Sequence, residues 1–230
     1  MSEPDNRRPI AARGAGWAHW LADRAAEGGA SPDLISATSF CCALLGAALL
    51  LVAGGVAFTP VRALLLMGAA GAIQLRLVCN LIDGMVAVEH RQGGSAGPIW
   101  NELPDRFSDV VLFAAAGYSL AAQNRLGGIE LGWIAATLAL ICAYVRELGR
   151  GMGFPADFSG PMAKQHRMAV LTIACLVSTV EQVWGWRGQT LMLGLAVIAV
   201  GAAATIWRRT ATLAGRLAER ARQNPSGGNP

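Results

Sequence analysis

Charged and polar residues interrupt two apolar stretches in the first half of the chain. Arg76, Asn80 and Asp83 are spaced four and three residues apart, so on a helix they would share one face. After a short segment rich in glycine, Asp105 and Asp109 stand four residues apart and would share a face of the next helix. Carboxylates about 4 Å apart repel each other by roughly 4 kcal/mol at an effective dielectric constant of about 20. If the two helices pack together, we therefore expect a cation among these acids.

The side chains at these positions offer oxygen ligands only. Oxygen atoms of aspartate and asparagine suit Mg²⁺, Mn²⁺ or Ca²⁺ better than zinc, which prefers cysteine and histidine. The predicted metal ligands are Asn80, Asp83, Asn101, Asp105 and Asp109. The alternative is that these groups only hydrogen-bond to neighbouring helices or reach the interface with water. The direction of the Glu102 side chain stays open between two alternatives: it points into the cavity from the side, or it points toward water.

The composition indicates that the surrounding solvent is a lipid bilayer. Hydrophobic residues make up 53% of the chain, charged residues only 15%, and the mean hydropathy is +0.41. Six apolar stretches have about the length that a helix needs to cross a bilayer, near residues 37–58, 63–88, 105–122, 129–147, 168–184 and 189–207. We expect an all-α, polytopic membrane protein with six transmembrane helices. Since charges inside a bilayer cost roughly 2.5–3.5 kcal/mol each, the acids above require a functional reason.

The flanking segments predict the domain organisation. Residues 1–30 form a cytoplasmic leader and an N-terminal interfacial amphipathic helix, because Trp17 and Trp20 alternate with charged residues there. Residues 31–208 form the membrane domain, and residues 209–230 form a basic cytoplasmic tail suited to anionic membrane lipids. Fifteen lysines and arginines fall on the side of the termini and three on the other side. This bias places both termini in the cytoplasm.

The two polar segments resemble the signature of the CDP-alcohol phosphatidyltransferase family, which reads D-x-x-D-G-x-x-A-R-x8-G-x-x-x-D-x-x-x-D. This chain keeps the spacing without a gap, with Asn80, Asp83, Gly84, Ala87, Val88, Gly97, Asn101 and Asp105 at the signature positions. Asparagine stands at the first and third aspartate positions and valine at the arginine position. The chain therefore looks like a divergent bacterial branch of the family, located in the inner (cell) membrane.

The resemblance implies roles for individual residues. Asp83 resembles a metal ligand, and Asp105 resembles a metal ligand and the general base. Gly84, Ala87 and Gly97 match small residues that let the cytidine nucleotide approach the helix backbone. The implied cofactor is Mg²⁺ or Mn²⁺, with one or two ions. Asparagine keeps an oxygen ligand but removes a negative charge, so the two substitutions weaken the attraction for two ions. Asp109 or Glu102 could restore the lost negative charge.

Four basic residues resemble the family's pocket for the phosphate of the acceptor or of the lipid: Arg146, Arg150, Lys164 and Arg167. Guanidinium groups offer a planar fork of donors that suits phosphate. The alternative is that these residues only contribute to the positive charge of the cytoplasmic side.

The resemblance implies an enzyme of phospholipid biosynthesis. It would transfer a phosphatidyl group from a CDP-linked lipid such as CDP-diacylglycerol to a polar alcohol and release CMP. Its partners would be the lipid donor, the alcohol acceptor and membrane lipids, with no nucleic acid, and the family suggests a homodimer. Two alternatives stay open: a small membrane transporter, or a non-catalytic CDP-lipid binder of the same fold. The identity of the acceptor also stays open.

Overall fold

The computed structural model describes residues 11–57, 59–89 and 97–223 of the chain. Within these ranges the chain forms helices and no strand. The α-helices are α1 (Gly16–Glu27), α2 (Pro32–Gly55), α3 (Thr59–Glu89), α4 (Gly97–Ala122), α5 (Gly128–Gly151), α6 (Lys164–Ser178) and α7 (Gln189–Gln223). Two short 3-10 helices, η2 (Ala11–Gly14) and η3 (Glu181–Trp184), complete the described elements. The predicted all-α class is confirmed.

Among the described residues, four helices are long and apolar enough to cross a membrane: α2, α3 up to Val88, α5 and α7. The first half of α4 carries Glu102, Asp105 and Asp109, which lower its hydropathy. Helix α6 has only 15 residues. The structure thus supports a multi-pass membrane protein, while the number of six crossings stays a prediction.

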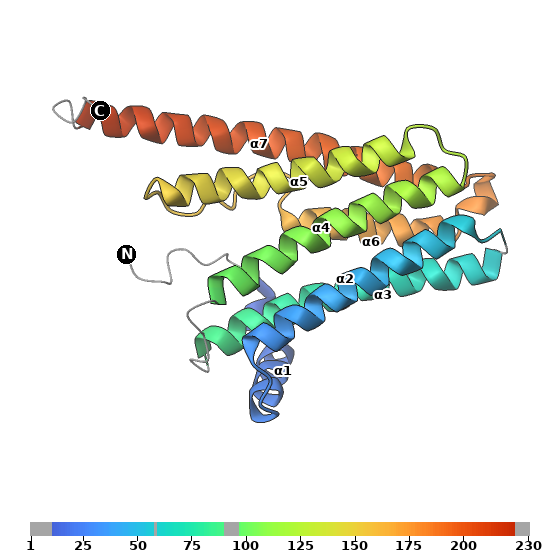
Figure 1. The fold of residues 1–230 in the computed structure, drawn as a ribbon, viewed down its shortest axis with the longest axis horizontal. Coiled ribbons are helices and arrows are strands. Elements are labelled where there is room, and N and C mark those ends of the chain that lie inside the picture. The colour runs from blue at the N-terminus through green and yellow to red at the C-terminus, as the bar shows by residue number, and fades with distance from the viewer. Residues whose placement is uncertain (1–10, 58, 90–96, 224–230) are drawn as a thin grey trace.

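The six helices from α2 to α7 pack in a closed ring (Figure 1). Around the ring, α3 packs on α2, α2 on α4, α4 on α5, α5 on α7, α7 on α6, and α6 again on α3. Small residues let neighbouring helices approach closely, as packing in lipid favours. A Cβ atom on Gly117 of α4 would lie 2.7 Å from the carbonyl oxygen of Gly128, and one on Gly132 of α5 would lie 2.7 Å from that of Phe113. Backbone therefore contacts backbone along the α4–α5 interface.

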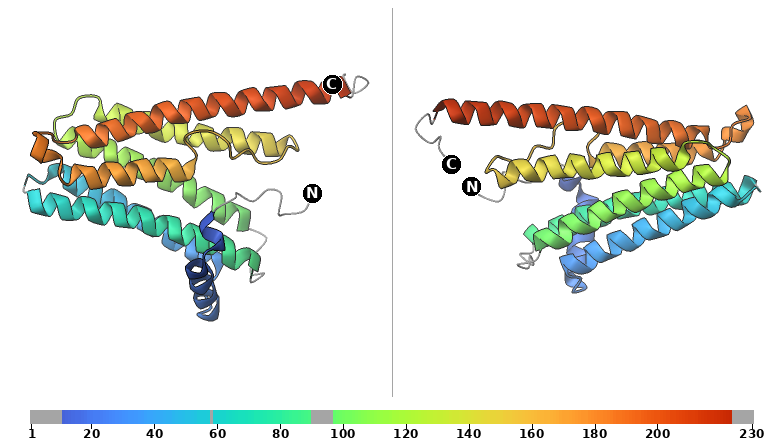
Figure 2. Two further views of the ribbon diagram at one scale, coloured as in Figure 1. Left: turned by 180° about the vertical axis from the view of Figure 1, so that it is seen from behind. Right: turned by 45° about the horizontal axis from the view of Figure 1, so that its top comes forward.

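Helix α1 lies across the bundle near the end where α3 finishes and α4 begins (Figures 1 and 2). Its buried Ala18 and Ala22 belong to a small apolar cluster with Met85 of α3. Trp17 and Trp20 on α1 are exposed. The apolar surface of α1 and its transverse direction agree with a helix that lies along a membrane surface.

A buried ion pair closes the opposite end of the bundle. Arg62 of α3 donates to Glu181 of η3 at 2.8 Å and to Gln123 at 3.0 Å. The Glu181 carboxylate also accepts the backbone N–H groups of Gly188 and Thr190 at 2.5 and 3.1 Å. This end is fixed by its own polar contacts, far from the acids that the sequence singled out.

Candidate functional site

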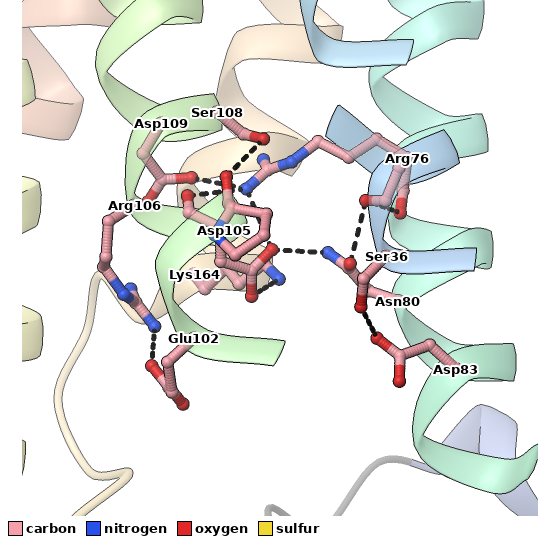
Figure 3. Close-up of polar contacts among 12 residues, drawn as sticks. Ser36, Arg76, Asn80, Asp83, Glu102, Asp105, Arg106, Ser108, Asp109 and Lys164 are labelled. Carbon is pink, nitrogen blue, oxygen red and sulfur yellow. Dashed lines mark hydrogen bonds and ion pairs between the residues drawn. The ribbon is translucent and has the colours of Figure 1, made fainter. Parts of the chain in front are cut away.

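The two signature aspartates lie near the end of the bundle that carries α1 and belong to separate hydrogen-bonded groups in Figure 3. Asp83 lies on α3 and Asp105 on α4, and both side chains are buried among the described residues. The hydroxyl of Ser36, from α2, donates to Asp83. In Figure 3, Asn80 and Ser36 lie between the side chains of Asp83 and Asp105. The meeting of the two acids at one metal ion therefore stays a prediction.

The carboxylate of Asp105 is held by donors from two other helices. Its Oδ1 atom accepts the amide N–H of Asn80 at 2.7 Å and a guanidinium N–H of Arg76 at 3.3 Å. Its Oδ2 atom pairs with the ammonium group of Lys164, the first residue of α6. Donors and cations of α3 and α6 thus fix the charged form of Asp105 in one orientation (Figure 3).

Asn80 contacts Asp105 as a hydrogen-bond donor. The hydroxyl of Ser39, on α2, donates to the amide oxygen of Asn80 at 2.8 Å. The amide nitrogen of Asn80 therefore faces Asp105, and its oxygen faces Ser39. In this arrangement Asn80 orients Asp105. Its predicted role as a metal ligand stays a prediction.

Arg76 and Asp109 form the deepest part of the network. Arg76 is fully buried and donates to the Oδ1 atom of Asp109 at 2.9 Å and to the backbone oxygen of Asp105 at 3.1 Å. The Oδ2 atom of Asp109 accepts from Arg167 at 2.8 Å, and Arg167 also donates to the backbone oxygen of Met162 at 3.0 Å. Both oxygens of Asp109 are thus engaged by arginines, which favours a structural role over a ligand role.

A second group of charges lies at the start of α4 and the end of α5. The Oε2 atom of Glu102 accepts from Arg106 at 2.5 Å and from Arg146 at 2.6 Å. Glu147 pairs with Arg146 and Arg150, each at 2.8 Å. The four predicted phosphate-binding residues are therefore divided between two groups. Lys164 and Arg167 pair with Asp105 and Asp109, which together with Arg76, Asn80 and Asp83 form the inner network. Arg146 and Arg150 pair with Glu102 and Glu147 of this outer group.

The outer group borders a small basic pocket between α5 and α7. Arg146, Arg209 and Arg216 line it together with Asp157. Burial raises the pKa of Asp157, but the hydrogen bonds from Ser159 and the charges of Arg209 and Arg216 together hold that pKa below its usual value. Arg209 is buried and donates to the backbone oxygens of Cys142 and Ser159 at 2.8 and 2.9 Å. Arg209 and Arg216 belong to the predicted basic tail (residues 209–230), to which no phosphate-binding role was assigned.

The predicted nucleotide-binding positions lie along the same two helices. Gly84 and Ala87 are half-buried on α3, and Gly97 begins α4. A Cβ atom on Gly97 would meet no atom of the described residues within 4 Å. Asn101 lies on α4, but its side chain falls outside the described part of the structure, as does the segment 90–96.

The acids that a divalent cation would need are already engaged by side chains. In the described ranges, no group of three or more His, Cys, Asp or Glu side chains is arranged to hold a metal ion. Asp83 accepts from Ser36, and both oxygens of Asp105 are engaged, by Asn80, Arg76 and Lys164. Mg²⁺ is usually bound by one or two carboxylates, with water and substrate phosphates as further ligands. An ion of this kind would have to displace Lys164 or Asn80 in order to bind Asp105.

Three side chains in this network had no role in the sequence interpretation: Ser36, Ser39 and Arg76. The two serines are spaced three residues apart in an otherwise apolar stretch, which was the available signal. Arg76 was seen on the same face as Asn80 and Asp83, but its partners lie on other helices. Their identity could not be read from the spacing.

Comparison with known proteins supports the family resemblance. No family model matches the chain. The chain is 32% identical over 153 residues to the bifunctional IPC transferase and DIPP synthase of Rubrobacter xylanophilus, a match covering 64% of this chain and 31% of that protein. The chain thus spans about a third of the length of this curated relative.

Solved structures match over most of the chain. The phosphatidylinositol phosphate synthase of Mycobacterium tuberculosis with CDP-DAG bound superposes with a TM-score of 0.72 and 19% identity, covering 86% of this chain and 94% of that one. The same synthase in complex with manganese and citrate gives a TM-score of 0.70 and 18% identity, covering 85% and 88%. These comparisons bear out the resemblance to CDP-alcohol phosphatidyltransferases predicted from the signature, and this chain has the fold of that phosphatidylinositol phosphate synthase.

Proposed function

We propose that this chain is a membrane enzyme that transfers a phosphatidyl-type group from a CDP-linked lipid to an alcohol and releases CMP. The observation that carries the proposal is the convergence of Asn80, Asp105 and Lys164 from three helices, in a fold shared with a synthase solved with CDP-DAG bound. Asp83 follows Asn80 by three residues on α3. Carboxylates from two helices next to a lysine provide sites for a divalent cation and for a phosphate. The transporter alternative has no comparable support, because the acids gather at one end of the bundle.

The inner network supplies the catalytic groups of the proposed reaction. Asp83 and Asp105 would hold Mg²⁺ or Mn²⁺, which supplies charge neutralisation at the diphosphate of the donor when bound. Asp105 accepts the proton of the attacking hydroxyl at Oδ2, the atom that Lys164 contacts. Lys164 turns toward the substrate phosphate at that stage and so frees this oxygen. Asn80 and Arg76 keep the carboxylate oriented through its other oxygen.

The remaining site residues bind and position the substrates. Gly84, Ala87 and Gly97 leave room for the nucleotide along α3 and α4, and Asn101 is the proposed further oxygen ligand. Arg146 and Arg150 hold the phosphate of the lipid or of the acceptor, exchanging their carboxylate partners for phosphate oxygens. Positioning of this kind supplies much of the barrier reduction in a transfer between two bound substrates.

Arg167 and Asp109 support the site from inside the bundle. Arg167 is nearly fully buried and bound to Asp109, so it acts on phosphate only at the inner edge of the site. Asp109 would be a metal ligand only if it released an arginine. Its proposed contribution is therefore to hold Arg76 and Arg167 in place.

The proposed topology has six crossings, with α4 and α6 as the third and fifth. Both helices lie within the closed ring of apolar helices, which supports this count. Residues 31–208 form the membrane domain, α1 lies at the interface, and residues 209–230 form the basic tail. Both termini lie in the cytoplasm of a bacterium in this proposal, with the protein in the inner membrane, and the charge bias supports this orientation. The acceptor is a polar alcohol, and a homodimer is what the family suggests.

The test is turnover of radiolabelled CDP-diacylglycerol by the purified protein with a panel of polar alcohols. CMP and a new lipid are expected with at least one alcohol, and Asp105→Asn should abolish CMP release while the protein stays folded in the membrane. Asp23→Asn, which alters an exposed acid on α1, is the matched control and should keep turnover. Full activity of Asp105→Asn would reject its role as the base. Metal-independent CDP binding without turnover would instead indicate a binder, and a proteoliposome flux that needs Asp83 but ignores CDP-lipids would indicate a transporter.

A further inference from the structure

The segment that joins α5 to α6, residues 152–163, is attached to α7 at several points. Arg220, near the end of α7, donates to the backbone oxygen of Met152 at 2.8 Å and lies over the ring of Phe154. About three turns earlier on α7, Arg209 donates to the backbone oxygen of Ser159 at 2.9 Å. Later residues of the segment therefore contact earlier residues of α7, and the two run in opposite directions.

Thr205 of α7 holds the last residues of this segment. Its side chain is fully buried, and its Oγ1 atom accepts the backbone N–H of Met162 at 2.9 Å. The same hydroxyl donates to the backbone oxygen of Gly201, on its own helix, at 2.8 Å. Gly160 has a φ of +117°, and a Cβ atom there would lie 2.5 Å from the methyl carbon of Thr205. The backbone of the segment thus lies directly on Thr205, which leaves no space for a side chain at position 160.

The hydrogen bonds of Met162 fix the backbone in front of α6. Its N–H is bound to Thr205, and its carbonyl oxygen accepts from Arg167 at 3.0 Å. The N-cap residue of α6 provides no side-chain hydrogen bond, so the start of the helix depends on these contacts. Lys164 begins α6 two residues after Met162, and its ammonium group pairs with Asp105 (Figure 3). The reach of Lys164 to that carboxylate therefore depends on where Met162 lies.

We propose that Thr205 is a positioning residue of the transfer reaction, which holds Lys164 against Asp105 by fixing the backbone in front of α6. This inference rests on the proposed function, in which Lys164 contacts Asp105 and then the substrate phosphate. The hydroxyl of Thr205 is used by the backbone of Met162 and Gly201, so it acts on the reaction only through the place of Lys164.

The first test is turnover of CDP-diacylglycerol by purified full-length variants in detergent, well below their unfolding midpoints. Thr205→Val keeps the shape of the side chain but leaves the buried N–H of Met162 without an acceptor. It should lower kcat for CMP release about 10-fold and change KM for the CDP-lipid less than about 2-fold, because a displaced Lys164 loses an interaction of the transition state. Thr205→Ser keeps the acceptor and should restore kcat to within about 2-fold of the wild type.

Matched variants separate positioning from stability. Thr212→Val removes a hydroxyl about two turns later on α7, where it bonds to the backbone oxygen of Arg208 at 3.0 Å, and should leave turnover unchanged. In a Lys164→Met background, Thr205→Val should have little further effect on kcat, whereas a merely structural role predicts equal effects in both backgrounds. Gly160→Ala disturbs the same contact from the other side and should reproduce the loss of kcat, which keeps the inference testable if Thr205→Val does not fold.

The place of Lys164 can also be measured without turnover, because it is the single lysine of the sequence. Its side chain is 15% exposed and paired with Asp105. Acetylation by sulfo-N-hydroxysuccinimide acetate, read by mass spectrometry of the peptide that contains Lys164, should be about 3-fold or more faster in folded Thr205→Val than in the wild type or Thr205→Ser.

The outcomes separate this inference from the proposed function. Wild-type kcat and acetylation in Thr205→Val would overturn the inference and leave the transferase proposal intact. Equal effects of Thr205→Val with and without Lys164, or no recovery in Thr205→Ser, would overturn it as well. An inactive wild type whose Thr205→Val variant is acetylated faster would reject the transferase proposal and still support the placement of Lys164 by Thr205.

Discussion

Replacing Asp109 by asparagine should destabilise the protein far more than it impairs the chemistry. Asp109 binds Arg76 through one oxygen at 2.9 Å and Arg167 through the other at 2.8 Å. Asparagine keeps an acceptor for one arginine but turns an NH₂ group toward the other. Neither buried guanidinium group would then face a negative charge at this position, and one of them would face the NH₂ donor of the asparagine.

The burial of the three groups sets the magnitude. Arg76, Asp109 and Arg167 have relative exposures of 0%, 1% and 2%, so water cannot replace the lost partner. Removing one partner of a buried ion pair typically costs about 3–5 kcal/mol. For a chain of this size about 1 kcal/mol shifts the unfolding midpoint by roughly 2–4 °C, so the midpoint should fall by about 6–20 °C.

The assay is thermal unfolding of the purified variants in detergent, combined with CMP release well below the midpoint. Asp109→Asn should unfold early yet keep measurable turnover, whereas Asp105→Asn should lose turnover. Glu27→Gln is the control, because the Arg24–Glu27 pair is exposed and 3.8 Å long and should contribute less than about 1 kcal/mol. An Asp109→Asn protein with an unchanged midpoint and no turnover would refute this reasoning and assign Asp109 to the bound metal or substrate.

Three further predictions concern binding, packing and metal. Lys164→Met should lower kcat/KM for CMP release by about 10- to 100-fold, since a hydrogen bond to a charged group contributes roughly 1.5–3 kcal/mol; unchanged kinetics would exclude a contact with the substrate phosphate. Gly132→Ala should lower the free energy of unfolding by about 1–3 kcal/mol through overpacking, because the added Cβ would lie 2.7 Å from the carbonyl oxygen of Phe113. Gly71→Ala should be neutral by comparison, because its Cβ would meet nothing within 4 Å. Removal of divalent ions with a chelator should stop CMP release, and Mg²⁺ or Mn²⁺ should restore it; turnover that persists would contradict a metal requirement.

Most of the fold could be predicted from hydropathy, but not the ends of every element. The stretch near 37–58 corresponds to α2, which begins earlier because Ser31 accepts the N–H of Leu34 and caps the helix. The predicted span 168–184 is broken, since α6 ends at Ser178 and η3 follows. The break accompanies the pairing of Glu181 with Arg62, a residue 119 positions earlier. Hydropathy along the chain carries no information about such a partner.

The site was predictable to the extent that it depends on spacing within a helix. Asn80 on the first polar stripe contacts Asp105 on the second, whereas the expected meeting of Asp83 with Asp105 stays a prediction. Spacing does not give the rotation of one helix against another, so it could not tell whether the cation beside Asp105 and Asp109 would be a metal ion or a side chain. The structure shows Arg76 there, 29 and 33 positions away in sequence.

The departures from the signature and the position of Arg76 have a common electrostatic effect. Asparagine at positions 80 and 101 removes two of the four negative charges of the signature. Arg76 adds a positive charge beside Asp105 and Asp109. Unit charges about 4 Å apart interact by roughly 4 kcal/mol at an effective dielectric constant of about 20, so a doubly charged ion at that distance is repelled by a guanidinium group by about 8 kcal/mol and attracted by one carboxylate by the same amount. Each of these changes therefore lowers the affinity of the site for divalent ions.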